Sequence, residues 1–196
     1  ADKNDPLAAK NLIREEDLYG RTLMVGGGSP PALRAVQHRL IASGKIGALK
    51  SIRRSYGAYV RRADWQAFKE FGGGMLMDWG VHLLDQILFM LPQKIESVYA
   101  QMTNVTNEDC DDGFTAQLQF ENDVVVEVQV ATSNFIGLPR WYVLGENGTA
   151  SIERWTLEGK IVMVSDWEHR DAVPVVTAAG ITKTMAPRTS ETIKEY

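Results

Sequence analysis

The sequence has only one cysteine and three histidines, and this scarcity limits the chemistry that the chain can carry out. The lone thiol, Cys110, cannot form a disulfide within the chain, which fits a reducing compartment and predicts a cytoplasmic protein. It lies in an acidic run, residues 107–112, where neighbouring carboxylates disfavour the thiolate that a nucleophile requires. With so few thiol and imidazole groups, a metal-dependent hydrolase is only a third hypothesis, and no metal site is expected.

A basic surface and a membrane-spanning segment are also missing. The net charge is −4 and the pI is about 5.4, which argues against nucleic acid or an anionic membrane as a partner. The longest apolar stretch, residues 75–91, is interrupted by Asp78, His82 and Asp85, so it is no transmembrane candidate. No signal peptide is evident, and a hydrophobic fraction of 44% is that of an ordinary globular domain.

The most informative stretch is the triple glycine 72–74 followed by the apolar segment 75–91. Glycines let a backbone or a ligand approach closely, and the following segment is long and apolar enough for a buried helix. Asp78, His82 and Asp85 follow the spacing i, i+4, i+7, so they share one helical face. Burying such groups needs a reason, and two are open. The first is a hydrogen bond from His82 to Asp78 in the core, and the second is an acid–base pair lining a pocket.

A polar loop precedes the triple glycine and is a further candidate for a site. Arg61, Asp64 and Trp65, together with the neighbouring Arg62, could contact a polar ligand, and the indole could stack on a sugar-like ring. Gly74, the last glycine before the helix, would let a ligand approach the backbone. The alternative is a solvated loop with one anchoring aromatic residue.

Most of the chain after residue 92 is predicted to be β-structure. Apolar and polar residues alternate over 114–120 and 124–131, which predicts a hairpin with one apolar face. Further strands, joined by tight turns into an antiparallel meander, are expected at 95–104, 140–145, 150–157 and 160–166. Earlier elements are expected to be helices at 5–19 and 29–43 and strands at 21–25 and 49–60. The pattern predicts an α+β fold with an open, mostly antiparallel β-sheet and helices packed on one face.

Several of these stretches together resemble the Gfo/Idh/MocA family of NAD(P)-dependent oxidoreductases. The most specific part is the block GGGMLMDWGVHLLD over residues 72–85. The supporting stretches are 21–26, 42–47, 96–100 and 145–149. The resemblance covers most of residues 20–165 and implies a C-terminal substrate domain whose open sheet commonly forms the subunit interface. A homodimer or homotetramer is therefore expected.

The resemblance also implies roles for individual residues. His82 would be the general base that takes the hydroxyl proton as hydride leaves for the nicotinamide of NAD or NADP, and Asp78 would position it. Asp85 matches the family's pattern, but it is interpreted as structural. The implied substrate is a sugar, a polyol or a related hydroxy compound. The alternative is a non-catalytic oligomerisation or ligand-binding module in which Asp78 and His82 form only a core hydrogen bond.

The resemblance does not extend to the nucleotide-binding motifs. The glycine fingerprint of the Rossmann domain and the lysine of its E-K-P motif are absent from the sequence. Residues 1–26 are expected to be the last helix and strand of that domain, and residues 27–196 the substrate-binding and oligomerisation domain. The chain as given is therefore expected neither to bind NAD(P) tightly nor to turn over, whereas a longer parent would do both.

Overall fold

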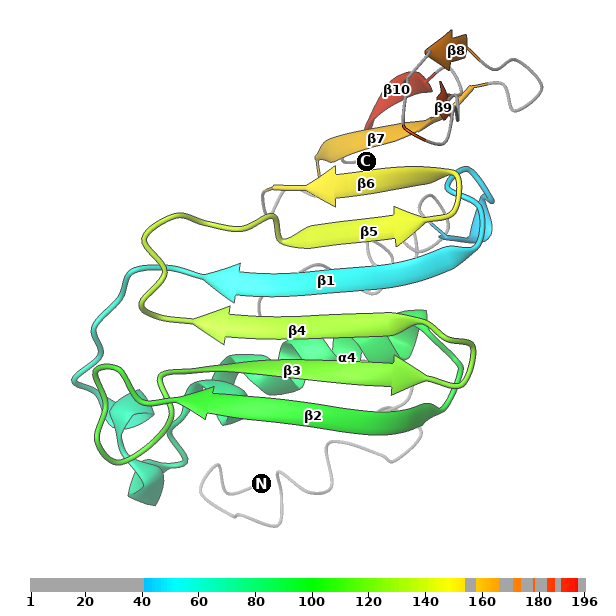
Figure 1. Ribbon diagram of the computed structural model, residues 1–196. Coiled ribbons are helices and arrows are strands. Elements are labelled where there is room, and N and C mark those ends of the chain that lie inside the picture. The colour runs from blue at the N-terminus through cyan, green and yellow to red at the C-terminus, as the bar shows by residue number, and fades with distance from the viewer. Residues whose placement is uncertain are drawn as a thin grey trace, which may run out of the picture.

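The computed structural model describes residues 41–153, 158–165, 171–173, 178, 183–185 and 188–193. Its strands are β1 (Leu49–Gly57), β2 (Ile95–Thr103), β3 (Gly113–Phe120), β4 (Val125–Ala131), β5 (Trp141–Gly145), β6 (Gly148–Ile152), β7 (Gly159–Val164), β8 (Asp171–Val173), β9 (Lys183–Met185) and β10 (Arg188–Ile193). Its helical elements are η2 (Trp65–Ala67), η3 (Lys69–Phe71), η4 (Leu76–Gly80) and α4 (Val81–Met90). Figure 1 shows α4 lying against one face of a broad, twisted sheet.

The main sheet has eight strands in the order β10-β7-β6-β5-β1-β4-β3-β2, and β8 pairs separately with β9. Neighbouring strands of the main sheet run antiparallel except β1 and β4, which are parallel. This arrangement confirms the predicted α+β fold with an open, mostly antiparallel sheet. The hairpin of β3 and β4 is confirmed as well, with Phe120 bonded to Val124 across the turn.

The predicted meander is wrong at one point, because β5 does not pair with β4. Strand β1 lies between them and pairs with both (Figure 1). The connection over residues 132–140 is too long for a tight turn, so it can carry the chain across β1. Hydrogen bonds fix it there, since Ser55 donates its amide to Arg140 O and its hydroxyl to Pro139 O at 3.1 and 2.5 Å. Alternation along the strands predicted their faces but not their order.

The central helix predicted at 75–91 is present, but its first turn is π-helical. The π segment η4 continues into α4, which ends where Leu91 turns extended before Pro92. Asp111 caps the beginning of the helix, since its carboxylate accepts from the amide of Leu76 at 2.9 Å. Single π turns are rare and occur frequently at functional sites. The local geometry therefore directs attention to the amino-terminal end of this helix.

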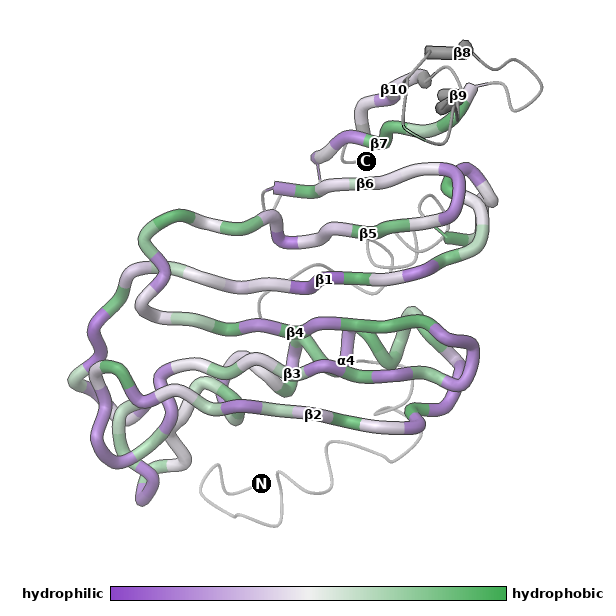
Figure 2. Tube along the Cα trace, in the orientation of Figure 1, coloured by the Kyte–Doolittle hydropathy of each residue, from purple (hydrophilic) through white to green (hydrophobic). Residues whose placement is uncertain are grey.

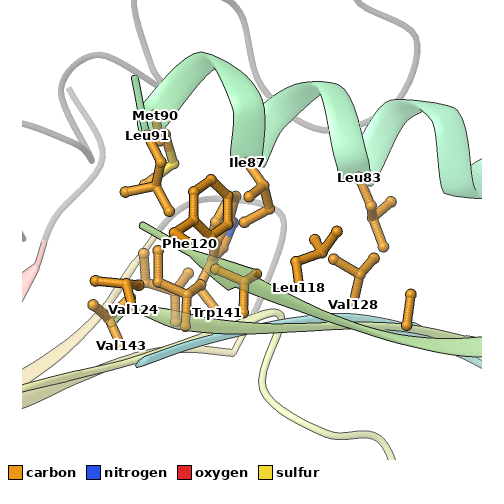
Figure 3. Packing of buried hydrophobic residues seen from close by; sticks show 14 of the residues in the cluster. Leu83, Ile87, Met90, Leu91, Leu118, Phe120, Val124, Val128, Trp141 and Val143 are labelled. Atoms are coloured by element: carbon orange, nitrogen blue, oxygen red, sulfur yellow. The ribbon is translucent and has the colours of Figure 1, made fainter. Parts of the chain in front are cut away.

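The core lies between α4 and the sheet, as Figure 3 shows. Leu83 and Ile87 point from the helix towards Leu118, Phe120 and Val128, and all five are at most 4% exposed. Hydrophobic and hydrophilic residues alternate along the paired strands (Figure 2). The buried hydrophobic residues of β3 and β4 face the helix, and burial of such side chains supplies most of the favourable free energy of folding.

A buried arginine lies within this core without a carboxylate among its described hydrogen-bond partners. Arg54 is 0% exposed and donates from Nε to Gln86 Oε1 at 2.9 Å. Its Nη1 donates to the carbonyls of Ser55 and Arg140 at 2.9 and 3.1 Å, and its Cζ lies 4.6 Å from the ring centroid of Trp141. Burial, together with the charge of Arg140, lowers the pKa of Arg54 to about 9. The polar residue Gln86 in the apolar helix therefore satisfies this guanidinium.

Several predictions concern residues outside the described part of the chain. They are the helix at 5–19, the strand at 21–25 and all but the end of the helix at 29–43, so the domain boundary at 26/27 stays a prediction. No helix within the described residues has both the length and the apolar character needed to cross a membrane.

Candidate functional site

The parallel strands β1 and β4 end at the same edge of the sheet (Figure 1). A pocket lies beyond these ends. It contains about 310 Å³ of empty space, part of which is open to solvent. The lining residues come from β1 and the loop after it, from the end of β4 and from the helix: Tyr56, Ala58, Val60, Arg62, Gln66, Met75, Trp79, Ala131 and Thr132. Ligands of open α/β sheets typically bind beyond the carboxyl ends of parallel strands, so this is where a site is expected.

Two aromatic rings form one wall of the pocket. Tyr56 of β1 stacks on Trp79 of η4, with ring centroids 3.8 Å apart and an interplanar angle of 15°. The guanidinium carbon of Arg140 lies 5.5 Å from the centroid of the Tyr56 ring. Burial lowers the pKa of Arg140 to about 10. Flat, apolar aromatic surfaces of this kind suit the apolar faces of sugar rings.

Gln66 supplies the polar side of the pocket, and several neighbours hold it in place. Its backbone amide donates to Asp64 Oδ1 at 3.1 Å. Its carbonyl oxygen accepts from the amide of Gly74 at 2.9 Å and from Cys110 Sγ at 3.3 Å. Its side-chain Nε2 donates to Oδ2 of Asp78. Gln66 therefore connects the pocket to the first of the predicted catalytic residues.

Asp78 and His82 are both half-buried, so neither side chain is sealed inside the protein. Burial raises the pKa of the Asp78 carboxyl, and the nearby Asp64 adds to this effect. The charges of His82 and Arg62 and the hydrogen bond from Gln66 act in the opposite direction without cancelling it. A carboxyl with a raised pKa next to a pocket is typical of acid–base sites. His82 interacts with Asp78 through charge, while Gln66 makes the hydrogen bond.

The predicted contacts of the polar loop lie at the rim of this region. Arg61 is exposed and donates from Nε to a tyrosine hydroxyl at 3.1 Å. Asp64 caps η2 and forms an ion pair with Arg62 at 2.6 Å, and Trp65 is 48% exposed. Arg62 and Gln66 are the residues of this loop that line the pocket. A ligand contact by Arg61, Asp64 or Trp65 stays a prediction.

The triple glycine allows a close approach of neighbouring groups, as predicted. The approaching group is the polar loop at Gly73 and the side chain of Asp111 at Gly74. A Cβ at Gly73 would lie 2.6 Å from the carbonyl oxygen of Gln66. Gly74 has φ +109°, and a Cβ there would lie 2.5 Å from Asp111 Oδ1. Only glycine fits these two positions without displacement of the neighbours. A contact between Gly74 and a ligand stays a prediction.

The buried thiol of Cys110 belongs to this framework as a hydrogen-bond donor. Burial, with the carboxylates of Asp111 and Asp109, raises its pKa above the ordinary value. The thiolate is therefore disfavoured, in agreement with the prediction from the acidic run.

Sequence reasoning missed the residues that line the pocket most directly. Tyr56 is hidden in a strand pattern that predicts a core position, and Thr132 follows a strand without any local signal. Met75 and Trp79 both line the pocket and are four residues apart. This helical spacing was the available signal that the two side chains share one face. Gln66 lies in the loop that was singled out, but an uncharged side chain there did not stand out. Asp85 is exposed on α4.

The described residues do not fit a dinucleotide. Its phosphates require free backbone amides at the beginning of a helix that follows a parallel strand. Here Asp111 occupies the beginning of the helix, since its carboxylate and carbonyl oxygens accept from Leu76 N at 2.9 Å and Met75 N at 3.1 Å. A negative charge there would repel a phosphate. Among the described residues, no group of three or more His, Cys, Asp and Glu side chains could hold a metal ion.

Comparisons with known proteins were made for the sequence and for the structure. The family model of the GFO/IDH/MocA C-terminal domain matches residues 35–151. No curated protein matches the chain. An NAD-binding protein from Listeria innocua is similar, with 32% identity and a TM-score of 0.67 over 83% of this chain and 48% of that one.

More distant solved structures share the fold. One is an NAD binding oxidoreductase from Klebsiella pneumoniae, with 19% identity and a TM-score of 0.62 over 84% of this chain and 44% of that one. Another is levoglucosan dehydrogenase in complex with NADH, with 18% identity and a TM-score of 0.61 over 83% and 44%. The chain thus spans about half the length of these solved structures. On the family match and the 32% identical relative, the chain belongs to the Gfo/Idh/MocA family, and residues 35–151 match its C-terminal domain.

Proposed function

We propose that the chain is the substrate-binding part of an NAD(P)-dependent oxidoreductase that acts on a hydroxyl group of a sugar, a polyol or a related compound. The observation that carries this proposal is the pocket beyond β1 and β4, with an aromatic wall on one side and Gln66 bonded to Asp78 on the other. The relatives support the reaction class. One is an NAD-binding protein, and another is a levoglucosan dehydrogenase solved with NADH and either levoglucosan or L-sorbose.

His82 is proposed to accept the proton of the reacting hydroxyl. Histidine is the side chain that most often serves as a general base, and a neighbouring carboxylate stabilises the imidazolium that forms. Asp78 supplies that negative charge, because the two groups already interact electrostatically. Trp79, which lines the pocket, lies three residues before His82 in the chain; His82 itself is not among the lining residues, and its approach to the bound hydroxyl is part of the proposal.

The pocket wall is proposed to select for a ring with an apolar face. The stacked pair of Tyr56 and Trp79 would contact that face, while Arg62, Gln66 and Thr132 would meet the hydroxyl groups. Arg61, Asp64, Trp65 and Gly74 belong to the surrounding rim and remain proposed contacts for a larger substrate.

The hydride acceptor is proposed to be the nicotinamide of NAD or NADP. Since the described residues do not fit a dinucleotide, we assign to this chain only the substrate side of the reaction: binding, orientation and proton acceptance. The family resemblance supports a separate Rossmann domain in a longer protein, with this chain inactive by itself. The buried, free Cys110 supports a reducing compartment, and we propose the cytoplasm.

The proposed function is tested by assaying the longer protein with NAD⁺ and NADP⁺ against a panel of sugars and polyols. We expect cofactor reduction with at least one member of the panel. Trp79→Ala should raise KM about tenfold by removing part of the wall. Leu88→Ala, at a 51% exposed leucine of α4 that does not line the pocket, is the control and should leave KM unchanged. A complete lack of oxidation with both cofactors would favour the non-catalytic module.

A role in oligomerisation is favoured by the sheet face opposite α4. Tyr142 and Leu144 alternate with the buried Trp141 and Val143, so they point away from the helix, and they are 42% and 39% exposed. Tyr99 of β2, 69% exposed, pairs with Gln117, which also lies on this face. Exposed tyrosines are enriched in protein interfaces. We propose a homodimer or homotetramer through this face, and size-exclusion chromatography showing a stable monomer would contradict it.

A further inference from the structure

We propose that Gln66 is a positioning residue for the proposed reaction: its side-chain amide holds the Asp78 carboxylate at the edge of the pocket and keeps it ionised. The inference rests on the proposed function, because a fixed carboxylate matters there for orienting His82. Gln66 is a residue to which neither the sequence motif nor the family resemblance assigns a role.

The position of Gln66 is unusual because it belongs to the pocket and to the acid–base pair at once. Its side chain lines the pocket, and Nε2 donates to Asp78 Oδ2. An amide group has two N–H donors and a carbonyl acceptor, so it can bond a carboxylate and present polar atoms to a bound hydroxyl group. The amide is neutral, so it stabilises the ionised carboxylate without removing the negative charge that His82 requires.

The backbone of Gln66 is fixed independently of its side chain. Its amide donates to Asp64 Oδ1 at 3.1 Å, and its carbonyl accepts from Gly74 N at 2.9 Å and from Cys110 Sγ at 3.3 Å. The close approach at Gly73 leaves no room for movement towards the helix. A side chain that extends from a fixed backbone imposes its position on its partner, and such preorganisation is what a site needs.

The electrostatic surroundings show why Asp78 needs a hydrogen-bond donor. Burial and the charge of Asp64 disfavour the ionised carboxylate, while His82 and Arg62 favour it. Arg62 is itself shared with Asp64, to which it is paired at 2.6 Å. The charges of His82 and Arg62 and, to a smaller extent, the hydrogen bond from Gln66 all oppose the effect of burial, and of these groups Gln66 is the one whose side chain bonds the carboxylate. Loss of this donor is expected to raise the pKa of Asp78 further and to free its carboxylate to rotate.

The first test measures the titration of Asp78 directly, by NMR of the side-chain carboxyl carbon in the 196-residue chain. Gln66→Met keeps the length of the side chain and removes the donor, and Gln66→Glu keeps the shape and adds a like charge. We expect the pKa of Asp78 to be lowest in the wild type, higher in Gln66→Met and highest in Gln66→Glu. Gln101→Met, at an exposed glutamine of β2, is the control and should leave it unchanged. An unchanged pKa in both Gln66 variants would overturn the inference.

The second test uses the longer protein and the best hydroxyl substrate from the panel. Gln66→Met should lower kcat/KM about tenfold and move the acidic limb of its pH profile to higher pH. Added to Asp78→Asn, the same change should lower kcat no further, because the two residues act as one unit in the proton transfer, while a rise in KM would report the contact of Gln66 with the substrate. A loss of kcat by Gln66→Met that persists in full in the Asp78→Asn background would contradict the positioning role. If the pKa shift is found but no substrate is oxidised, the proposed function fails while the link between Gln66 and Asp78 stands.

Discussion

Two aspartates near the carboxyl end of β4 have their pKa values shifted in opposite directions. Asp112 is 2% exposed, and its carboxylate accepts from the amides of Thr106 and Asn107 and from the hydroxyls of Thr106 and Thr103. Burial raises its pKa, but the hydrogen bonds from backbone amides outweigh this and lower it below the ordinary value. Asp78 is half-buried, accepts a side-chain hydrogen bond from Gln66, and has a raised pKa.

The opposite pKa shifts distinguish Asp112, a carboxylate with a structural role, from Asp78, a candidate for a functional role. Asp112 is buried deeper, yet its negative charge is satisfied on all sides by groups that belong to the fold. The Asp78 carboxylate, beside the pocket, has fewer hydrogen-bond donors than its burial calls for, as its raised pKa indicates. This lowers the stability of the fold and makes Asp78 a group whose protonation can change. Oppositely shifted carboxyl groups in one region indicate which one takes part in chemistry.

Asp78→Asn is expected to give the largest effect, and it acts on the activity of the longer protein. We expect kcat/KM to fall about 100-fold, because the charge that orients and stabilises His82 is lost. The free energy of unfolding should not fall, since asparagine still accepts from Gln66 and no carboxylate has to be desolvated. Steady-state kinetics and urea unfolding measure the two quantities. A stable variant with full activity would remove Asp78 from the proposed mechanism.

Asp112→Asn is expected to show the opposite pattern. The free energy of unfolding should fall by about 2 kcal/mol, because the two backbone amides and the Thr106 hydroxyl that bond to Oδ2 lose their charged acceptor. Urea denaturation of the 196-residue chain is the measurement. Unchanged stability would show that the hydrogen bonds to Asp112 are not what holds the loop before β3.

Gly73→Ala should disturb the site by way of Gln66 while leaving Asp112 alone. Its Cβ would press on the Gln66 carbonyl, so the free energy of unfolding should fall by about 2 kcal/mol. Gly72→Ala is the matched control: it has φ +75° but open space around it, and should cost about 1 kcal/mol. Urea unfolding of both variants tests this, and equal losses would show that the close approach at Gly73 is not tight.

The pH dependence of stability should give the smallest effect, with opposite signs for the two aspartates. Asp112 has a lowered folded-state pKa, so its contribution is present above the ordinary value of 3.8 and is lost as the pH falls through the folded pKa. Asp78 has a raised folded-state pKa, so its contribution is present below 3.8 and is lost as the pH rises through the folded pKa. Urea unfolding of wild type, Asp112→Asn and Asp78→Asn across acidic pH measures both. If the free energy of unfolding changed with pH in the same way in both variants, Asp78 and Asp112 would not differ in the proposed sense.

The sequence predicted those parts of the fold that depend on local periodicity. Strict alternation over 114–120 and 124–131 predicted β3, β4 and the face of each strand that is buried. These two strands follow one another in the chain and pair as a hairpin, so local sequence was sufficient. The order of the sheet could not be predicted, since β1 enters between β4 and β5 through contacts far apart in the sequence. The π turn at the beginning of the central helix was hidden as well, because an apolar pattern at helical spacing does not distinguish a π turn from an α turn.

The candidate site was predictable only in outline. Asp78 and His82 stood out because charged groups on an apolar helix need partners. Gln66 could not be identified as the partner, since a neutral amide in a polar loop carries no pattern. Tyr56 faces the pocket only because β1 ends there, next to its parallel neighbour β4.

His82, beside Asp78, is proposed to accept a proton from a hydroxyl substrate held in the pocket. The most direct measurement is kcat/KM of His82→Ala in the longer protein, compared with Asp85→Ala, an exposed residue on the same helix. We predict a loss of at least about 100-fold for His82→Ala and no change for Asp85→Ala, with both variants folded. Equal activity of His82→Ala and the wild type would contradict the claim.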